Sequence, residues 1–389
     1  MAIANRSISE GKMGWFTQLI GLGLVILALI DVFLSVLYPR SGKGWLSVPL
    51  SRGIWKLFGF MADLPRWKRQ KTRDRILSYA GPTVLVIVIA VWVLLLLFGF
   101  ALMVWVALGS AIQSSNGPTP TDFITAFYYS GYTLTTSGFG DLVPQTNSYR
   151  LLAIIESALG FSIFTLTITY LLSVYSALTQ RNVFALSLHH QTARAANAAE
   201  LLARLGADGD FQNSRQDIAQ IAVNALMLLE SHHAYPVLHY FRFQRPYYAM
   251  ARIALLTMDT ATLIRSALDE KQYRSLVNST AVAALGDGGQ HLLTELSNSF
   301  LPNCDRTRQQ QPDSVLRQWY YQAIDRLQLE GIATPADLDA GAELYITLRR
   351  QWEPYVMAMA AQLKYDWSDI APAEQHFQPL KYPDRLGSV

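Results

Sequence analysis

The sequence predicts an all-α membrane protein in which a short re-entrant segment separates two membrane spans and a helical domain follows. Only 16% of the 389 residues are charged, whereas globular chains carry about a quarter. Three apolar stretches exceed the roughly 20 residues that cross a bilayer, and the C-terminal half shows helical periodicity. This composition excludes an ordinary soluble enzyme and a disordered chain. Because Cys304 is the single cysteine, no internal disulfide is possible.

The three expected spans differ in their charge. The first, 15–37, contains Asp31; the second, 83–109, contains no charge; and the third, 151–178, contains Glu156. A cleaved signal peptide is the alternative for the first span. Its apolar run is too long for that, and no small-x-small cleavage site follows it.

Loop charge predicts the orientation. Residues 39–78 contain ten basic and two acidic residues, whereas residues 110–149 contain no Lys or Arg. The positive-inside rule therefore places the first loop in the cytoplasm and the second outside. The N-terminus is then extracytoplasmic, and everything after the third span is cytoplasmic. Arg6 and Lys12 in the N-terminal tail argue weakly for the opposite orientation.

A short helix is expected after the second span. Pro118 and Pro120 break that span, and Thr119 is a typical N-cap for a helix over 120–134. This helix is too short to cross the membrane, so it must enter and return. Non-helical backbone at that depth is tolerated only where it lines a polar or aqueous path.

The residues that follow this helix carry a recognisable motif, Thr-Thr-Ser-Gly-Phe-Gly-Asp over 135–141. It resembles the selectivity filter of tetrameric potassium channels, whose common form is T-V-G-Y-G-D. A dehydrated potassium ion needs a cage of oxygens in place of its water, and backbone carbonyls supply that cage in this family. Glycines permit the unusual backbone angles that it demands.

The resemblance implies a homotetramer that conducts K+ through a filter over 136–140, because one pore loop cannot close a ring. It implies no organic cofactor, no enzymatic activity and no nucleic-acid partner. The expected potassium ligands are the carbonyls of Thr136, Ser137, Gly138 and Phe139, with Gly140 completing the filter. The expected filter-supporting residues are Tyr128, Tyr129, Tyr132, Asp141 and Glu156.

The motif departs from the family pattern in ways that put strict potassium selectivity in doubt. Ser137 replaces the usual Val or Ile, and its side chain should point behind the filter. Phe139 lacks the hydroxyl that often ties the filter to the pore helix. Either Tyr132 supplies the missing hydrogen bond or the filter is softer than usual.

The third span has a face that recurs every four residues, which the family resemblance makes the pore-lining face of the inner helix. We expect a hinge at Gly160 and a hydrophobic gate on the same face. Packing on the second span is an equal alternative for the bulky residues. The expected gate residues are Phe164, Ile168 and Leu172.

Two intramembrane carboxylates lie at different depths. Asp31 is expected either to pair with a base of the 39–78 loop or to remain protonated. Glu156 is expected to brace the filter from behind.

The basic loop interleaves aromatic and basic residues, which predicts an interfacial helix and then a polybasic run against anionic lipid headgroups. A passive anchor and a regulatory element are equally compatible with it. The expected lipid-facing residues are Arg66, Lys68, Arg69, Lys71, Arg73 and Arg75.

The chain therefore divides into an N-terminus with the first membrane helix (1–38), a basic cytoplasmic or interfacial loop (39–81), a pore domain (82–180) and a helical cytoplasmic domain (181–389). In the last domain, helices are expected over 186–205, 214–234, 247–268, 272–299, 313–330 and 335–364. Gly286–Gly289 is interpreted as a helix break. No strand–GxGxxG–helix unit is present, and the ligand of this domain is unknown.

Three functions stay open: a potassium channel of the plasma membrane (the inner membrane, if bacterial), a weakly selective cation channel, or a membrane-anchored scaffold with a vestigial pore.

Overall fold

The computed structural model describes residues 2–38, 44–64, 70–212, 214–300 and 310–371. These residues form two compact units. The pore unit comprises 1–64, 79–176 and 233–241, and the helical unit comprises 65–78, 177–232 and 242–389. Each unit thus takes in a short segment that is distant in sequence from the rest of it.

The pore unit is built on apolar helices. They are α1 (Ala2–Val32), extended by a π-helical turn η1 (Phe33–Leu37), then α4 (Ala80–Trp105) and α6 (Asn147–Gln191). Among the described residues, three helical stretches are long and apolar enough to cross a membrane: Gly14–Leu37, Gln70–Trp105 and Asn147–Gln191. The inner helix thus begins earlier and ends later than the expected 151–178.

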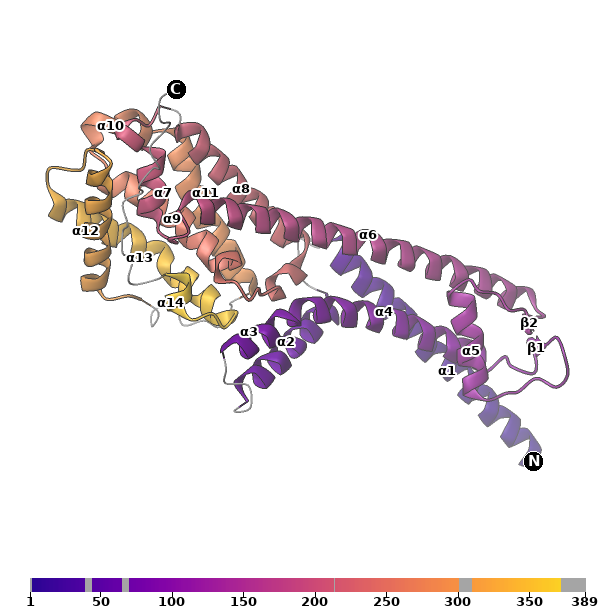
Figure 1. Ribbon diagram of the computed structural model, residues 1–389. Helices are drawn as coiled ribbons and strands as arrows, with labels where there is room; N and C mark the ends of the chain where they lie inside the picture. The colour runs from indigo at the N-terminus through magenta and orange to yellow at the C-terminus, as the bar shows by residue number, and fades with distance from the viewer. Residues whose placement is uncertain (1, 39–43, 65–69, 213, 301–309, 372–389) are drawn as a thin grey trace, which may run out of the picture. The chain divides into compact units, whose positions relative to one another are not determined.

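Helices α1 and α4 run side by side (Figure 1), and two glycines set their closest approach. A Cβ added at Gly99 would lie 2.8 Å from the carbonyl oxygen of Gly21. Small residues let helix backbones approach closely, which is the usual basis of helix packing within membranes.

Asp31 connects three parts of the pore unit. Its fully buried carboxylate accepts hydrogen bonds from Leu46 N (2.8 Å) and Ser47 N (3.2 Å), at the start of helix α2 (Ser47–Asp63), and from the indole of Trp92 on α4 (2.7 Å). The first N–H groups of a helix lack partners within it, so a carboxylate is a suitable cap. Among the described residues, the hydrogen-bond partners of Asp31 are therefore N–H donors and not a basic side chain, which was one of the two expectations for it.

A short helix and a two-stranded sheet separate α4 from α6. Strand β1 (Ile112–Ser114) pairs antiparallel with β2 (Leu142–Pro144). Helix α5 (Phe123–Leu134) has 12 residues, about 18 Å at 1.5 Å per residue. Its N-cap is Asp122, which accepts from Thr125 N at 3.0 Å. The predicted N-cap, Thr119, is wrong because its hydroxyl instead accepts from Ser114 N at 2.8 Å.

Segment 233–241 joins the pore unit from late in the chain. Its 3-10 helix η5 spans Pro236–Tyr240. The ring of Tyr235 lies 6.0 Å from that of Tyr170 on α6, and Tyr240 lies 6.3 Å from Trp55 on α2. Phe241 contacts α4, where a Cβ on Gly81 would lie 2.8 Å from its ring. The segment therefore packs against three helices of the pore unit.

The helical unit is an α-bundle around α9 (Met250–Ala267), which is buried on nearly every side. Four helices surround α9 (Figure 1): α7 (Ala198–Leu205), α11 (Thr280–Phe300), α12 (Asp313–Leu329) and α13 (Leu338–Gln362). The remaining elements of the unit are α3 (Gln70–Ser78), the end of α6, η4 (Ala207–Gly209), α8 (Ser214–Ala234), η6 (Pro246–Tyr248), α10 (Glu270–Val277) and α14 (Trp367–Ile370).

Three sequence-based expectations for this unit are wrong. The expected helix 186–205 is two elements, because its first part continues α6 and Asn197 caps α7 by accepting from Ala199 N at 2.8 Å. The expected helix 272–299 is split between α10 and α11. The glycines of Gly286–Gly289 do not break a helix but lie inside α11, where Gly289 lets α11 pack tightly against Met258.

Helix α3 belongs to the helical unit by its contacts. Arg242 Nη2 donates to Asp74 Oδ1 (2.5 Å), Arg242 Nε donates to Leu363 O (2.8 Å), and the guanidinium lies 4.2 Å from the ring centre of Tyr365. Arg73 lies 3.8 Å from Asp366. At least one basic residue of the 66–75 run, Arg73, thus contacts another part of the protein.

Candidate ion-conducting site

The predicted filter folds back onto the C-terminal end of α5. The carbonyl oxygen of Tyr132 accepts hydrogen bonds from Ser137 N (2.8 Å) and Gly138 N (3.4 Å), and Thr136 N donates to Thr133 O (3.0 Å). Helix carbonyls that lack partners within the helix are thereby satisfied. The loop that leaves the helix is consequently fixed at its start, while residues 135–141 are exposed in the single chain.

The backbone of this loop alternates in handedness. Thr136, Gly138 and Gly140 have positive φ values of 58°, 54° and 75°, and the residues between them do not. Alternation of this kind orients successive peptide planes alike, so that their carbonyls can face one side, as a carbonyl-lined filter requires. Two of the three positions are glycine, for which positive φ carries no steric cost. Thr136 bears a side chain there, a strain of order 1–3 kcal/mol that is typical of functional backbone.

Aromatic rings hold Phe139. Its ring stacks on Tyr128 (6.1 Å, interplanar angle 5°) and meets Tyr132 edge-on (5.7 Å, 70°). The hydroxyl of Tyr132 donates to Leu142 O at 2.9 Å, in the strand after the filter. Tyr129 packs against Tyr132 from the other side (5.2 Å). This bond ties the helix to the strand that follows the filter, which is one of the two arrangements expected of Tyr132; the stiffness of the filter stays a prediction.

The side chains of Ser137 and Asp141 stay close to the loop. The Ser137 hydroxyl lies 3.0 Å from that of Thr135, which donates to Gly131 O at 2.8 Å. Asp141 Oδ1 accepts from Leu142 N (3.1 Å), and its backbone carbonyl accepts from Ser115 N (2.8 Å). Both ends of the filter are therefore tied to the surrounding loop.

Helix α6 packs behind the end of α5. Ser157 Oγ donates to Thr133 O at 3.0 Å, and a Cβ on Gly160 would overlap the carbonyl oxygen of Leu134. Gly160 is thus required for this close approach, and its hinge role stays a prediction. Glu156 is fully buried beside Ser130, and no donor of the described residues reaches either carboxylate oxygen with ordinary hydrogen-bond geometry. Its bracing of the filter stays a prediction.

The predicted gate face of α6 is uncovered in the single chain. Phe164, Ile168 and Leu172 are exposed to 63%, 44% and 66%, whereas Tyr170 and Val174 on the same helix are buried. Only 11% of the most apolar window of α6 is buried, compared with 44% for the span that contains α4. The predicted gate residues therefore do not pack on the second span.

The structure describes three of the six predicted lipid-facing residues. Arg66, Lys68 and Arg69 lie outside the described residues. Lys71 and Arg75 are exposed, and a lipid role for them stays a prediction.

Sequence reasoning missed several residues that shape the site. Thr133 and Thr135 hold the loop to α5, and Leu142 accepts from Tyr132. The Thr-rich end of the helix was the available signal, because Ser and Thr side chains commonly bond to nearby backbone.

Comparison with known proteins shows what the chain is similar to in sequence. Residues 87–177 match the sequence profile of a family described as "Ion channel". Over 249 residues the chain is 29% identical to "Uncharacterized membrane protein YdjJ" of Bacillus subtilis (strain 168), covering 63% of this chain and 68% of that protein. Over 67 residues it is 39% identical to "TWiK family of potassium channels protein 7" of Caenorhabditis elegans, covering 17% of this chain and 12% of that protein. No solved structure matches.

These similarities support an ion-channel family, which is not an enzyme family. The chain is an all-α membrane protein in which residues 87–177 are similar to that family and a further helical unit follows.

Proposed function

We propose that this protein is one subunit of a homotetrameric potassium channel that conducts K+ passively through residues 136–140. The observation that carries the proposal is the alternation of positive φ at Thr136, Gly138 and Gly140 in a loop anchored to the end of a re-entrant helix. Few other roles require three residues with positive φ within five consecutive positions. The resemblance of the T-S-G-F-G-D sequence to potassium-channel filters supports the choice of ion.

Four copies are proposed because one loop supplies only one wall of an ion cage. The uncovered face of α6, with Phe164, Ile168 and Leu172, offers the apolar surface that neighbouring subunits and the pore would occupy. The same residues form the proposed gate, since bulky apolar side chains can close a pore by excluding water.

Regulation by the helical unit is proposed from segment 233–241. This segment continues directly into the helical unit, and its rings contact the inner helix: Tyr235 lies against Tyr170, and Phe241 lies 6.3 Å from Tyr175. A shift of this segment would therefore bear on the proposed gate helix. The basic residues of the 39–78 loop support a cytoplasmic helical unit by the positive-inside rule.

The test is potassium flux from liposomes that contain the purified protein. We expect K+ efflux, exceeding Na+ efflux under matched gradients, and a cross-linked species of four chains. Equal K+ and Na+ efflux would indicate the weakly selective alternative. Assembly without any flux would indicate the scaffold and refute the channel proposal.

The topology has its own test. Single cysteines at Asn116 and Lys71, in a Cys304→Ser background, are treated with an impermeant reagent on intact cells. We expect labelling at position 116 only, and labelling at position 71 only would overturn the orientation.

A further inference from the structure

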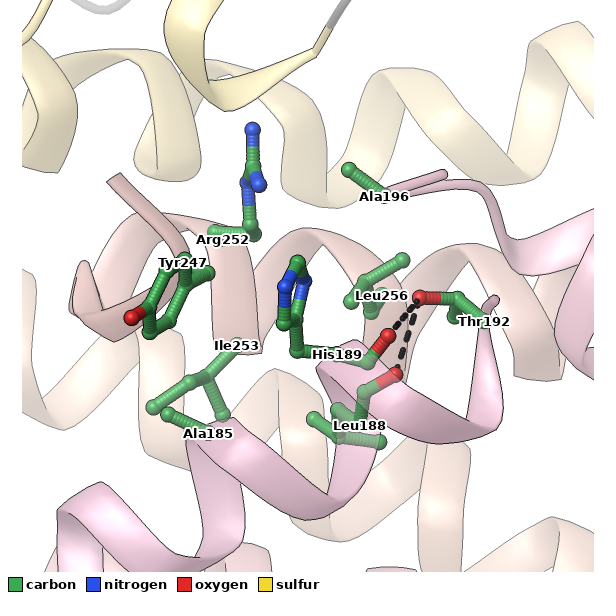
Figure 2. Close-up of a pocket in the computed structure, with 9 residues that line it drawn as sticks. All are labelled: Ala185, Leu188, His189, Thr192, Ala196, Tyr247, Arg252, Ile253 and Leu256. Atoms are coloured by element: carbon green, nitrogen blue, oxygen red, sulfur yellow. Dashed lines mark hydrogen bonds between the residues drawn. The ribbon is translucent and has the colours of Figure 1, made fainter. Parts of the chain in front are cut away.

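A buried positive charge in the helical unit forms no ion pair with the described residues. Figure 2 shows the recess that contains it, between the end of α6 and the start of α9, with Arg252, His189 and Tyr247 around it. Arg252 is only 9% exposed. Its Nη2 donates to the backbone carbonyl of Asp369, and its Nε has no hydrogen-bond partner in the part of the chain that the structure describes. Burial lowers the pKa of Arg252 to about 10, so the guanidinium stays charged at neutral pH.

No carboxylate of the described residues lies within ion-pair distance of Arg252. The carboxylate of Asp369 attracts the guanidinium from farther away and bonds to Gln70 Nε2 at 3.3 Å. A buried cation is usually paired, because removal from water disfavours the charged form. The missing partner is therefore a feature that needs a physical explanation.

His189 presents a second unpaired nitrogen to the same recess. Its Nδ1 is buried and has no hydrogen-bond partner among the described residues, and its ring is held by stacking on Tyr247 at 4.4 Å and 14°. The charged residues that act on His189 are Arg252, His190 and Arg194, all of them basic. The recess has no room for a water molecule (about 0 Å³), so water does not satisfy either nitrogen in this closed state.

Donors already occupy carbonyl oxygens at the end of α6. Thr192 Oγ1 donates to Leu188 O (2.9 Å) and to His189 O (3.2 Å), as the dashed lines in Figure 2 show. The loop that follows is strained: Ala193, Arg194 and Ala196 have φ values of 50°, 70° and 56°. Strained backbone of this kind is common in switch segments.

We propose that this recess is a binding site for the phosphoryl or carboxylate group of a small soluble molecule. Adjacent N–H groups of a guanidinium match two oxygens of such a group, and His189 adds a donor when its proton is on Nδ1. Binding would require the end of α6 to move away from α9. The proposal does not rest on the proposed channel function, because it concerns occupancy of the helical unit alone.

The experiment is calorimetric titration of the full-length protein in detergent with sodium phosphate, and separately with sodium acetate, against sodium chloride at matched ionic strength. We expect saturable binding of at least one of the two anions. Arg252→Met should weaken that binding roughly 10- to 100-fold, the factor for losing a hydrogen bond to a charged group. The exposed Arg215 supplies the control, and Arg215→Gln should bind as the wild type does.

His189→Phe keeps an aromatic ring to stack on Tyr247 and removes both ring nitrogens, so it tests the site even if Arg252→Met fails to fold. It should weaken binding roughly tenfold, a factor within the range for one hydrogen bond. No saturable binding of either anion to the wild type, or equal binding to wild type and His189→Phe, would overturn the proposal. Binding to phosphatidylglycerol vesicles but to neither free anion would overturn the assignment to a small soluble molecule.

Discussion

Removing the carboxylate of Asp74 should destabilise the helical unit. The side chain of its partner Arg242 is 2% exposed and that of Asp74 is 17% exposed. Deleting one partner of a buried ion pair leaves an uncompensated charge, at a cost of about 3–5 kcal/mol. Arg242 keeps carbonyl acceptors on Leu363 and Lys364, so we expect Asp74→Ala to cost about 3 kcal/mol.

The assay is thermal unfolding of the full-length protein in detergent, followed by near-ultraviolet circular dichroism. At about 2–4 °C per kcal/mol for a unit of this size, the midpoint of the helical unit should fall by roughly 6–12 °C. Arg75→Ala, on the same helix and exposed, should cost less than about 0.5 kcal/mol.

The double variant Asp74→Ala with Arg242→Met should recover much of the loss, because replacing a buried pair with apolar groups is often close to neutral. A midpoint for Asp74→Ala within 2 °C of wild type would refute the reasoning that α3 is held in the helical unit by this pair.

Two other substitutions probe the filter. Tyr132→Phe removes the bond to Leu142 O and should destabilise the assembled protein by about 1–3 kcal/mol, with K+ flux retained. The measurement is dissociation of the oligomer on heating. Tyr149→Phe is the matched control away from the filter, and equal effects of the two substitutions would contradict the role given to Tyr132. Gly160→Ala places a methyl group against the carbonyl of Leu134 and should cost about 1–3 kcal/mol through overpacking; a normal yield of assembled protein with unchanged thermal stability would show that α6 does not approach α5 so closely.

Local patterns in the sequence were enough to predict the apolar helices and the filter motif. An uncharged run of more than twenty residues has few alternatives to a membrane span, and two glycines in a threonine-rich loop after a short helix limit the backbone strongly. The helices over 214–234 and 313–330 were also predicted within a residue or two, because loop residues delimit them.

Contacts between distant segments could not be predicted in the same way. The placement of α3 in the helical unit depends on Arg242, which lies 168 residues after Asp74 in the chain. The partners of Asp31 depend on where the chain turns into α2. Glycines 286–289 suit a helix break by propensity, but the fit of α11 against α9 overrides that preference.

The central claim is that ions pass through residues 136–140, and bi-ionic reversal potentials under K+ and Na+ test it most directly. Gly138 has a φ of 54°, where alanine costs about 1–2 kcal/mol of strain per chain. Four chains share the proposed filter, so Gly138→Ala should abolish conduction while the protein still assembles. Ser137→Val changes no carbonyl, so it should conduct and keep or raise the preference for K+ over Na+. Unchanged currents from Gly138→Ala would contradict the account, because ions would then not pass through this loop.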